Sequence, residues 1–137
     1  FFAQWGVSFD AMCASFEHYF SADCRWAQRP LPVTRGPMEA VRFLQRSQKL
    51  LGLATIDVEI TQLAVRDGVV HSARIDHLRR ADGSLMVSAP VAGVMVFRDG
   101  KIADWREYFD VASFAGSFCT QGLVTLYGKL QTLRRER

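Results

Sequence analysis

The sequence predicts one α+β domain, in which helices from the first half of the chain pack over one face of a curved antiparallel sheet from the second half. Two patterns predict this fold class. The first half repeats apolar residues at helical spacing, and the second half carries three Asp-Gly pairs, each between strand-compatible segments. The 137 residues, of which 49% are hydrophobic and 23% charged, suit a single domain with its own core and exclude disordered, collagen-like and fibrous proteins.

Aromatic residues at the start of the chain fall on one face of a predicted helix over residues 1–9. They are Phe1, Phe2, Trp5 and Phe9. Asp10 is the expected N-cap of a second helix, which continues to Phe20 with apolar residues at helical spacing.

Proline and glycine residues divide the rest of the first half. Residues 24–35 contain Pro30 and Pro32, which predicts a short strand followed by a loop. Pro37 suits the first turn of a further amphipathic helix, and Gly52 suits its end.

The three Asp-Gly pairs predict tight turns between four strands. We expect these strands at roughly 56–66, 69–81, 84–98 and 101–109. The third strand is almost uniformly apolar, so we expect it to be covered on both faces. Helical or mixed structure is expected at 111–133, and the basic residues 134–137 are expected to form a frayed tail. A curved sheet closed by helices makes a cone with a pocket inside.

Charge and cysteine content narrow the functional classes. The net charge is +3, with the excess mostly in residues 133–137, so dedicated nucleic-acid binding is not indicated. The three cysteines and three histidines lack the spacing of a disulfide framework or a metal site, so we expect no metal and reduced thiols in a cytoplasmic protein. No apolar run is long enough for a membrane span, and no signal-peptide pattern is visible.

Charged residues inside the predicted sheet are the candidates for chemistry. Arg74 and Asp76 are two residues apart on one strand, so they share a face and can pair. Glu107 shares a face of the last strand with Trp105 and Phe109, and a carboxylate between two aromatic residues indicates pairing or use. The pattern leaves an alternative open for each group, with Arg74 and Asp76 on a solvated face and Glu107 at an exposed strand edge.

The pairing register decides whether these groups meet. Two-residue turns place Asp76 opposite Ala89 and Glu107 opposite Ala92, and the side chains of these two alanines point to opposite faces. A joint site therefore requires one extra residue in the ladder, which we predict as a bulge or as a wider turn at 99–101. The third strand holds two residues where bulges are expected, Pro90 and Gly93.

Three segments of the predicted sheet form a recognisable set. They are Arg74-Ile75-Asp76, Pro90-Val91-Ala92-Gly93-Val94-Met95 and Trp105-Arg106-Glu107-Tyr108-Phe109-Asp110. With the helix around Trp5, the segment 19–23 and the Gly36-Pro37 helix start, this set resembles the limonene-1,2-epoxide hydrolase family of the SnoaL-like, NTF2-like superfamily. The resemblance covers about residues 1–111 and implies an NTF2-like cone over residues 1–137 as a single domain.

The resemblance implies a catalytic group of Arg74, Asp76 and Glu107, with Glu107 where the family has Asp. Trp26 and Gln28 stand where the family has a Tyr and an Asn that hold the nucleophilic water. In the implied one-step reaction, Glu107 is the general base on a water that Gln28 and Trp26 help to hold. Protonated Asp76 donates to the epoxide oxygen, and Arg74 bridges the two carboxylates. No metal or organic cofactor is required.

An apolar pocket for a small terpene-like or polyketide-like epoxide is also implied. The candidate wall residues are Trp26, Met38, Leu78, Met95, Trp105 and Phe109. Plain core packing is the alternative interpretation for each of them.

Two other functions stay open on the same scaffold. One is a SnoaL-like cyclase or a ketosteroid-isomerase-like enzyme, in which a carboxylate abstracts a carbon-bound proton. The other is a non-catalytic small-molecule-binding or dimerisation module, in which side chains fill the cavity and Arg74 and Asp76 form a structural ion pair. The resemblance further implies a homodimer, with exposed apolar residues of the sheet and the Leu-rich segment 123–133 as candidate interface.

Overall fold

The computed structural model describes residues 1–110, 112 and 116 and confirms the α+β class. In this part of the chain the elements are η1 (Phe2–Gln4), α1 (Phe9–Tyr19), β1 (Phe20–Arg29), β2 (Thr34–Arg35), α2 (Gly36–Leu51), β3 (Thr55–Arg66), β4 (Val69–Arg79), β5 (Leu85–Arg98) and β6 (Lys101–Phe109). The structure predicted for 111–133 and for the tail 134–137 lies outside the described residues, apart from residues 112 and 116.

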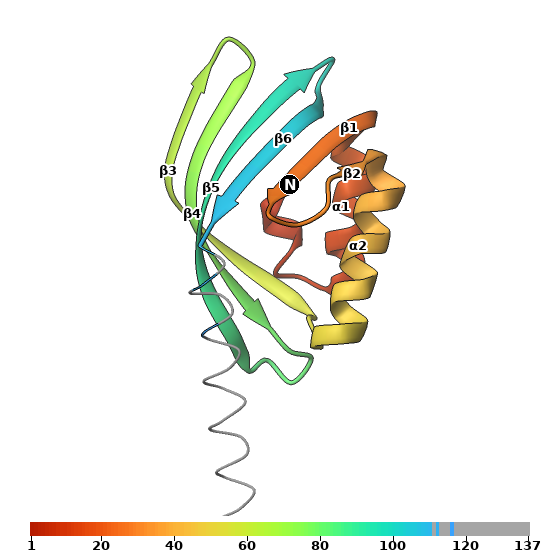
Figure 1. Cartoon of the computed structure of the whole chain (residues 1–137), viewed down its shortest axis with the longest axis vertical. Helices are drawn as coiled ribbons and strands as arrows, with labels where there is room; N and C mark the ends of the chain where they lie inside the picture. Colours follow the sequence, from red (N-terminus) through yellow and green to blue (C-terminus); the bar gives the residue numbers. More distant parts are fainter. Residues whose placement is uncertain (111, 113–115, 117–137) are drawn as a thin grey trace, which may run out of the picture.

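The strands form one sheet in the order β2-β1-β6-β5-β4-β3. The sheet is strongly curved, and α1 and α2 lie against the concave side of one part of it (Figure 1). The meander β3 to β6 is antiparallel as predicted, whereas β1 runs parallel to β6. This parallel pair was not foreseen, because β1 and β6 are separated by α2 and the whole meander and no local turn links them.

Two of the predicted tight turns have the geometry that Asp-Gly pairs favour. Asp67 and Gly68 both have positive φ angles, and so do Asp99 and Gly100. Positive φ at both central positions matches the right-handed twist of the flanking strands, which explains why these two turns connect β3 to β4 and β5 to β6.

The start of the chain differs from the prediction. Only a short 3₁₀ turn, η1, forms within residues 1–9, and Ser8 rather than Asp10 caps α1. The Ser8 backbone is extended, and its hydroxyl accepts a hydrogen bond from the backbone N–H of Ala11 at 3.0 Å. Because an extended residue cannot continue a helix, the helix expected over residues 1–9 is interrupted at this point. By contrast, α2 contains Pro37 in its first turn and ends at Gly52, as predicted.

Strand β5 is covered on one face only, in the part of the molecule that the structure describes. Its inward residues Val87, Ala89 and Val91 are buried, while Ser88 and Pro90 are exposed on the outer face. The prediction of cover on both faces is therefore wrong. Small side chains on the outer face produced an apolar run without a second packing layer.

The core lies between the helices and the concave face of the sheet. It joins aromatic residues of the N-terminal segment to the sheet, with Trp5 stacked on Phe16 at 5.4 Å between ring centroids. Phe1 and Phe2 pack around the same cluster, so the aromatic residues of segment 1–9 still share one apolar environment.

The helices and cysteines of the described part add two findings. None of these helices combines the length and the apolar character that a membrane span needs. Cys24 is buried and Cys13 partly buried, both as free thiols, and Cys119 lies outside the described residues.

Candidate active site

Arg74 and Asp76 lie on one face of β4, two residues apart, and point into the concave side of the sheet. Arg74 Nε donates to Asp76 Oδ1 at 2.8 Å, and Arg74 Nη2 donates to Asp76 Oδ2 at 3.1 Å. The Arg74 side chain is 1% exposed and that of Asp76 9%. The pair is therefore buried, and its alternative placement on a solvated face is wrong.

Glu107 on β6 completes a bridged group, because Arg74 Nη2 also donates to Glu107 Oε1. The ladder between β5 and β6 pairs Val96 with Asp104 and Phe97 with Ile102, so it skips Ala103. This extra residue places Glu107 opposite Gly93 instead of Ala92 and turns its side chain to the concave face. The predicted extra residue exists, but it lies in β6 rather than near Pro90 or Gly93 or in the turn.

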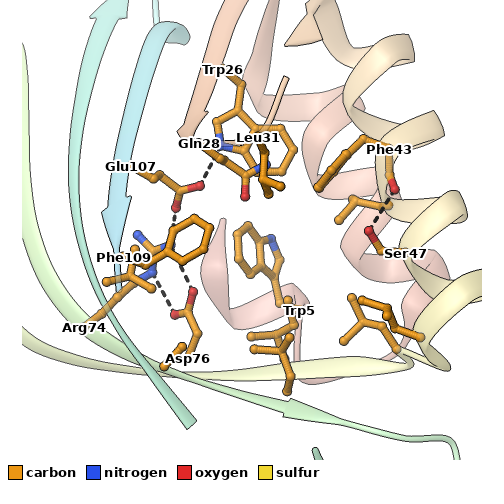
Figure 2. A pocket seen from close by; sticks show the side chains of 17 residues that line it. Trp5, Trp26, Gln28, Leu31, Phe43, Ser47, Arg74, Asp76, Glu107 and Phe109 are labelled. Atoms are coloured by element: carbon orange, nitrogen blue, oxygen red, sulfur yellow. Dashed lines mark hydrogen bonds and ion pairs between the residues drawn. The ribbon is translucent and has the colours of Figure 1, made fainter. Parts of the chain in front are cut away.

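Trp26 and Gln28 reach the same place from β1. The parallel register places Trp26 beside Trp105 and Gln28 beside Glu107. Trp26 Nε1 donates to Glu107 Oε2 at 2.7 Å, so its N–H binds the carboxylate (Figure 2). The Gln28 side chain lines the cavity and has no hydrogen-bond partner among the described residues.

Burial shapes the electrostatics of this group. Burial raises the pKa of Asp76 and of Glu107 above their ordinary values, and the charge of Arg74 only partly opposes this change. For Glu107, the hydrogen bond from Trp26 also opposes the change. Burial lowers the pKa of the Arg74 guanidinium. The negative charges of Glu107 and Asp76 and their hydrogen bonds outweigh burial, so the pKa of Arg74 lies above its usual value. Arg74 therefore stays charged, whereas the carboxyl groups are disposed to keep a proton.

Two aromatic rings lie close to the Arg74 guanidinium. Its central carbon lies 4.6 Å from the ring centroid of Phe2 and 5.5 Å from that of Trp105. These distances allow favourable cation–π contacts. Phe2 was not among the candidate site residues, because this contact joins the first residues of the chain to β4 and leaves no local pattern in the sequence.

The two carboxylates and Arg74 form the polar end of a cavity of about 250 Å³ between the sheet and α2 (Figure 2). Further lining residues are Trp5, Trp26, Gln28, Leu31, Phe43, Leu44, Ser47, Leu51, Leu53, Ile56, Leu78, Ala89, Val91 and Phe109. Apart from Gln28 and Ser47, this wall is apolar or aromatic, so the cavity combines a charged end with an apolar body.

The predicted wall residues fall into two groups. Trp26, Leu78 and Phe109 line the cavity. Met95 and Trp105 are buried in the core, and Met38 is 66% exposed on α2, so these three are not lining residues. Met38 lies in the first turn of α2 on its solvent side, whereas Phe43, Leu44 and Ser47 face the cavity. Phe43, Leu44 and Ser47 were not predicted as lining residues, although their helical spacing in α2 places them on one face.

The described residues contain no group of three or more His, Cys, Asp or Glu side chains that could hold a metal ion.

Comparison with known proteins adds a family match. The sequence profile described as "Limonene-1,2-epoxide hydrolase catalytic domain" matches residues 8–118. An LEH-like epoxide hydrolase from M. tuberculosis superposes with a TM-score of 0.68 at 27% sequence identity, over 88% of this chain and 86% of that one.

Two further solved structures show the same fold at lower identity. A protein named as a SnoaL-like polyketide cyclase from Shewanella denitrificans has a TM-score of 0.68 at 16% identity, over 82% of this chain and 88% of its own. A hypothetical protein with a ketosteroid isomerase-like fold from Catenulispora acidiphila, solved with trimethylamine, has a TM-score of 0.64 at 16% identity, over 81% and 82%. Both likenesses concern the fold alone, which is NTF2-like and SnoaL-like.

Proposed function

Because the chain belongs to the limonene-1,2-epoxide hydrolase family, we propose that it adds water to a small apolar epoxide and releases a vicinal diol. The observation that carries this proposal is the pair of buried carboxylates, Asp76 and Glu107, bridged by Arg74 at the polar end of an apolar cavity. Opening an epoxide needs a base for the attacking water and an acid for the leaving oxygen, and two carboxyl groups can divide these roles.

The net charge of the bridged group supports one protonated and one ionised carboxyl group. With both carboxylates ionised, the group would carry a net charge of −1 in a buried site, whereas one bound proton makes it neutral. Glu107 accepts hydrogen bonds from both Arg74 and Trp26, while the hydrogen bonds to Asp76 come from Arg74. Each carboxyl group accepts two hydrogen bonds, so their number favours neither site for the proton. We therefore assign the roles that the family resemblance implies, with Asp76 as the protonated general acid and Glu107 as the base.

The proposed step moves two protons and exchanges one bond for another. Glu107 takes a proton from a water molecule that the Gln28 amide helps to position, while the water oxygen forms a bond to an epoxide carbon. The bond from that carbon to the epoxide oxygen breaks, and the oxygen takes the proton of Asp76. The products are the diol, protonated Glu107 and ionised Asp76, and one proton must return from Glu107 to Asp76 before the next turnover.

The cavity supports a small, largely apolar substrate, such as a terpene-like or polyketide-like epoxide. Its volume of about 250 Å³ lies just below the range of about 300–1,000 Å³ that is common for ligand pockets. The apolar wall offers no charged partner beyond the bridged group itself.

The test is incubation of a panel of small epoxides in ¹⁸O-labelled water. We expect labelled diol from the wild type and none above background from Glu107→Gln or Asp76→Asn. Glu59→Gln is the matched control, because Glu59 lies on β3 with an exposed side chain that contacts His77. No diol from any epoxide with a folded protein would reject the proposal.

One observation favours a second candidate, a SnoaL-like cyclase or ketosteroid-isomerase-like enzyme. The Trp26 N–H binds Glu107 and is therefore not available to a water. Among the two predicted water-holding side chains, this leaves Gln28 to hold a water beside the carboxylate. Abstraction of a carbon-bound proton needs a base but no held water. Exchange of deuterium into a carbon acid without diol formation would support this candidate.

The non-catalytic alternative is less well supported. That alternative requires side chains to fill the cavity, whereas the lining residues leave about 250 Å³. A structural ion pair needs one carboxylate, whereas the buried Arg74 binds two.

A homodimer is the proposed assembly, through the outer face of the sheet. A groove on this face is lined by apolar residues, among them Leu63, Ala64, Ala92, Val94 and Tyr108, together with the polar residues Gln62, His71 and Ser72. We expect light scattering to give twice the 15.4 kDa of one chain. Tyr108→Lys should reduce this mass to that of the monomer, and Leu50→Lys on the exposed side of α2 should not. A monomeric wild type would contradict the assembly.

A further inference from the structure

The bridged group leaves one edge of Arg74 without a partner. Nε and Nη2 of Arg74 donate to the carboxylates, but Nη1 is buried and has no acceptor among the described residues. The indole Nε1 of Trp105 likewise has no acceptor among the described residues, and the Trp105 side chain is fully buried. Buried donors in folded proteins are nearly always paired with a protein group or an ordered water, so two such donors side by side call for an explanation.

Both donors converge on the space above Gly93. A Cβ atom added at Gly93 would lie 3.2 Å from Arg74 Nη1, 3.3 Å from Trp105 Nε1 and 3.1 Å from Ser72 Oγ. The register explains the convergence, because Gly93 pairs with Ser72 on one side and with Glu107 on the other. A Cβ here would lie closer to all three polar atoms than side chains ordinarily do, so glycine is favoured at this position.

The hydrogen-bonding capacities of the three atoms specify the missing partner. A guanidinium N–H and an indole N–H can only donate, whereas a serine hydroxyl can also accept. The partner must therefore accept two hydrogen bonds and can donate one. Water meets this requirement, and buried waters typically make about three hydrogen bonds. A small anion is disfavoured, because it would add negative charge beside two buried carboxyl groups.

We propose that one water molecule is bound at Gly93 as a fixed part of the site, accepting from Arg74 Nη1 and Trp105 Nε1 and donating to Ser72 Oγ. This water holds the third edge of the guanidinium, while the carboxylates hold the other two and the rings of Phe2 and Trp105 lie over the guanidinium. It is a positioning element, because it acts on the carboxylates through Arg74. Its effect on epoxide opening rests on the proposed function, but its presence does not.

The presence of the water can be tested by NMR in the wild-type protein. The indole N–H resonance of Trp105, identified by its loss in Trp105→Phe, should show a dipolar cross-peak to a long-lived water. Trp26 provides the internal reference, since its N–H donates to Glu107. A crystal structure at high resolution should show a water within hydrogen-bond distance of both orphan nitrogens. A clear map without this water, or an indole N–H of Trp105 that donates to a protein atom, would overturn the proposal.

Gly93→Ala tests the positioning role, because its methyl group fills the water site. We expect the Trp105 cross-peak to vanish and kcat/KM for epoxide opening to fall about 10- to 100-fold, as displaced reacting groups do. The acid limb of the pH profile should also move to higher pH, since a loosened guanidinium stabilises ionised Glu107 less well. The matched control is Ser88→Thr, which adds one methyl group to an exposed side chain of the same strand.

The outcomes separate this inference from the proposed function. If the wild type opens no epoxide, the proposed function fails, and the cross-peak and the map still decide whether the water is present. If the water is present but Gly93→Ala keeps both the rate and the pH profile, the positioning role is wrong. If Gly93→Ala does not fold, Ser72→Ala replaces it, and we expect a smaller shift of the same limb because one of the three partners of the water is lost.

Discussion

Trp26 and Glu107 lie on neighbouring parallel strands, and the indole N–H of Trp26 donates to the Glu107 carboxylate at 2.7 Å. The indole is itself stacked on Trp105, with 5.2 Å between the ring centroids and 10° between the planes. The direction of the N–H is therefore fixed by packing. In this chain Trp26 orients the carboxylate, whereas the family resemblance implied a side chain that holds the water.

Replacing Trp26 with Phe removes this donor and keeps an aromatic ring. Because the hydrogen bond favours the ionised carboxylate, its loss raises the pKa of Glu107 further. A base with a higher pKa is protonated over more of the acidic range, so the acid limb of kcat/KM should move to higher pH. At the acidic end we expect a loss of about 10-fold or more, as for other hydrogen bonds to charged groups.

A pH profile of epoxide opening measures this effect. Trp5→Phe is the matched control, since the Trp5 indole donates to Ser15 instead of a carboxylate. Its acid limb should stay in place whatever happens to its rate. An unmoved limb in Trp26→Phe would contradict the role given to Trp26.

Replacing Arg74 with Met should destabilise the protein strongly at neutral pH. The change leaves two buried carboxyl groups without their shared partner, and breaking a buried ion pair in this way typically costs about 3–5 kcal/mol. Arg79→Met is the control, because Arg79 pairs with Asp57 at 2.6 Å on a partly exposed part of the sheet. Such pairs contribute about 0–1 kcal/mol. Urea denaturation at pH 7 compares the two variants, and equal losses would contradict the prediction.

The stability of the fold should decrease as pH rises through the range where Asp76 and Glu107 titrate. Burial raises both pKa values above 3.8 and 4.5, so in this range the folded state binds more protons than the unfolded state. The stabilisation by bound protons is complete below the unfolded pKa values and is lost as pH rises through the higher folded values.

Exposed carboxylates act at lower pH and with the opposite sign. Hydrogen bonds from Ser21 and Arg98 lower the pKa of Asp23, so its contribution is lost as pH falls. The comparison that isolates the buried pair is therefore the wild type against Asp76→Asn from pH 4 upward. We expect the variant to become relatively more stable as pH rises, measured by urea denaturation at each pH. A constant difference would show that Asp76 has the same pKa in both states.

Enlarging the inward side chain of Val91 should select for smaller substrates. Val91 lines the cavity from β5, and Val91→Phe fills part of the 250 Å³. We expect kcat/KM to fall by about 10-fold or more for the larger epoxides of a panel and to change least for the smallest. Met38→Ala on the exposed surface of α2 is the control and should leave the ranking unchanged. A uniform loss across the panel would point to misfolding, which a thermal melt detects.

The sequence predicted the parts of the fold that depend on local signals. The strands of the meander follow from Asp-Gly turns, and both Asp67-Gly68 and Asp99-Gly100 have the required positive φ angles. The ends of α2 follow from Pro37 and Gly52 in the same way. The first helix was misplaced because Phe1 to Phe9 has helical spacing, yet the extended Ser8 interrupts it.

The parts that depend on distant contacts could be predicted only in outline. Residue spacing placed Arg74 and Asp76 on one face and required an extra residue to bring Glu107 to them, but it did not locate that residue at Ala103. The hydrogen bond from Trp26 joins residues 81 positions apart across a parallel pair that no turn predicts. The cation–π contact of Phe2 with Arg74 is equally remote in sequence.

Because the ladder skips Ala103, the face on which Glu107 lies depends on the number of residues that precede it in β6. Between the turn at Asp99-Gly100 and Glu107, each added or removed residue inverts which way position 107 faces, and two restore it. Insertions or deletions of an odd number of residues in this stretch should therefore turn Glu107 away from the cavity, whereas those of an even number should keep it there. Single replacements at 101–106 leave this number unchanged, so exposed positions such as Arg106 can vary in composition, whereas Ile102 and Trp105 are also constrained by the core.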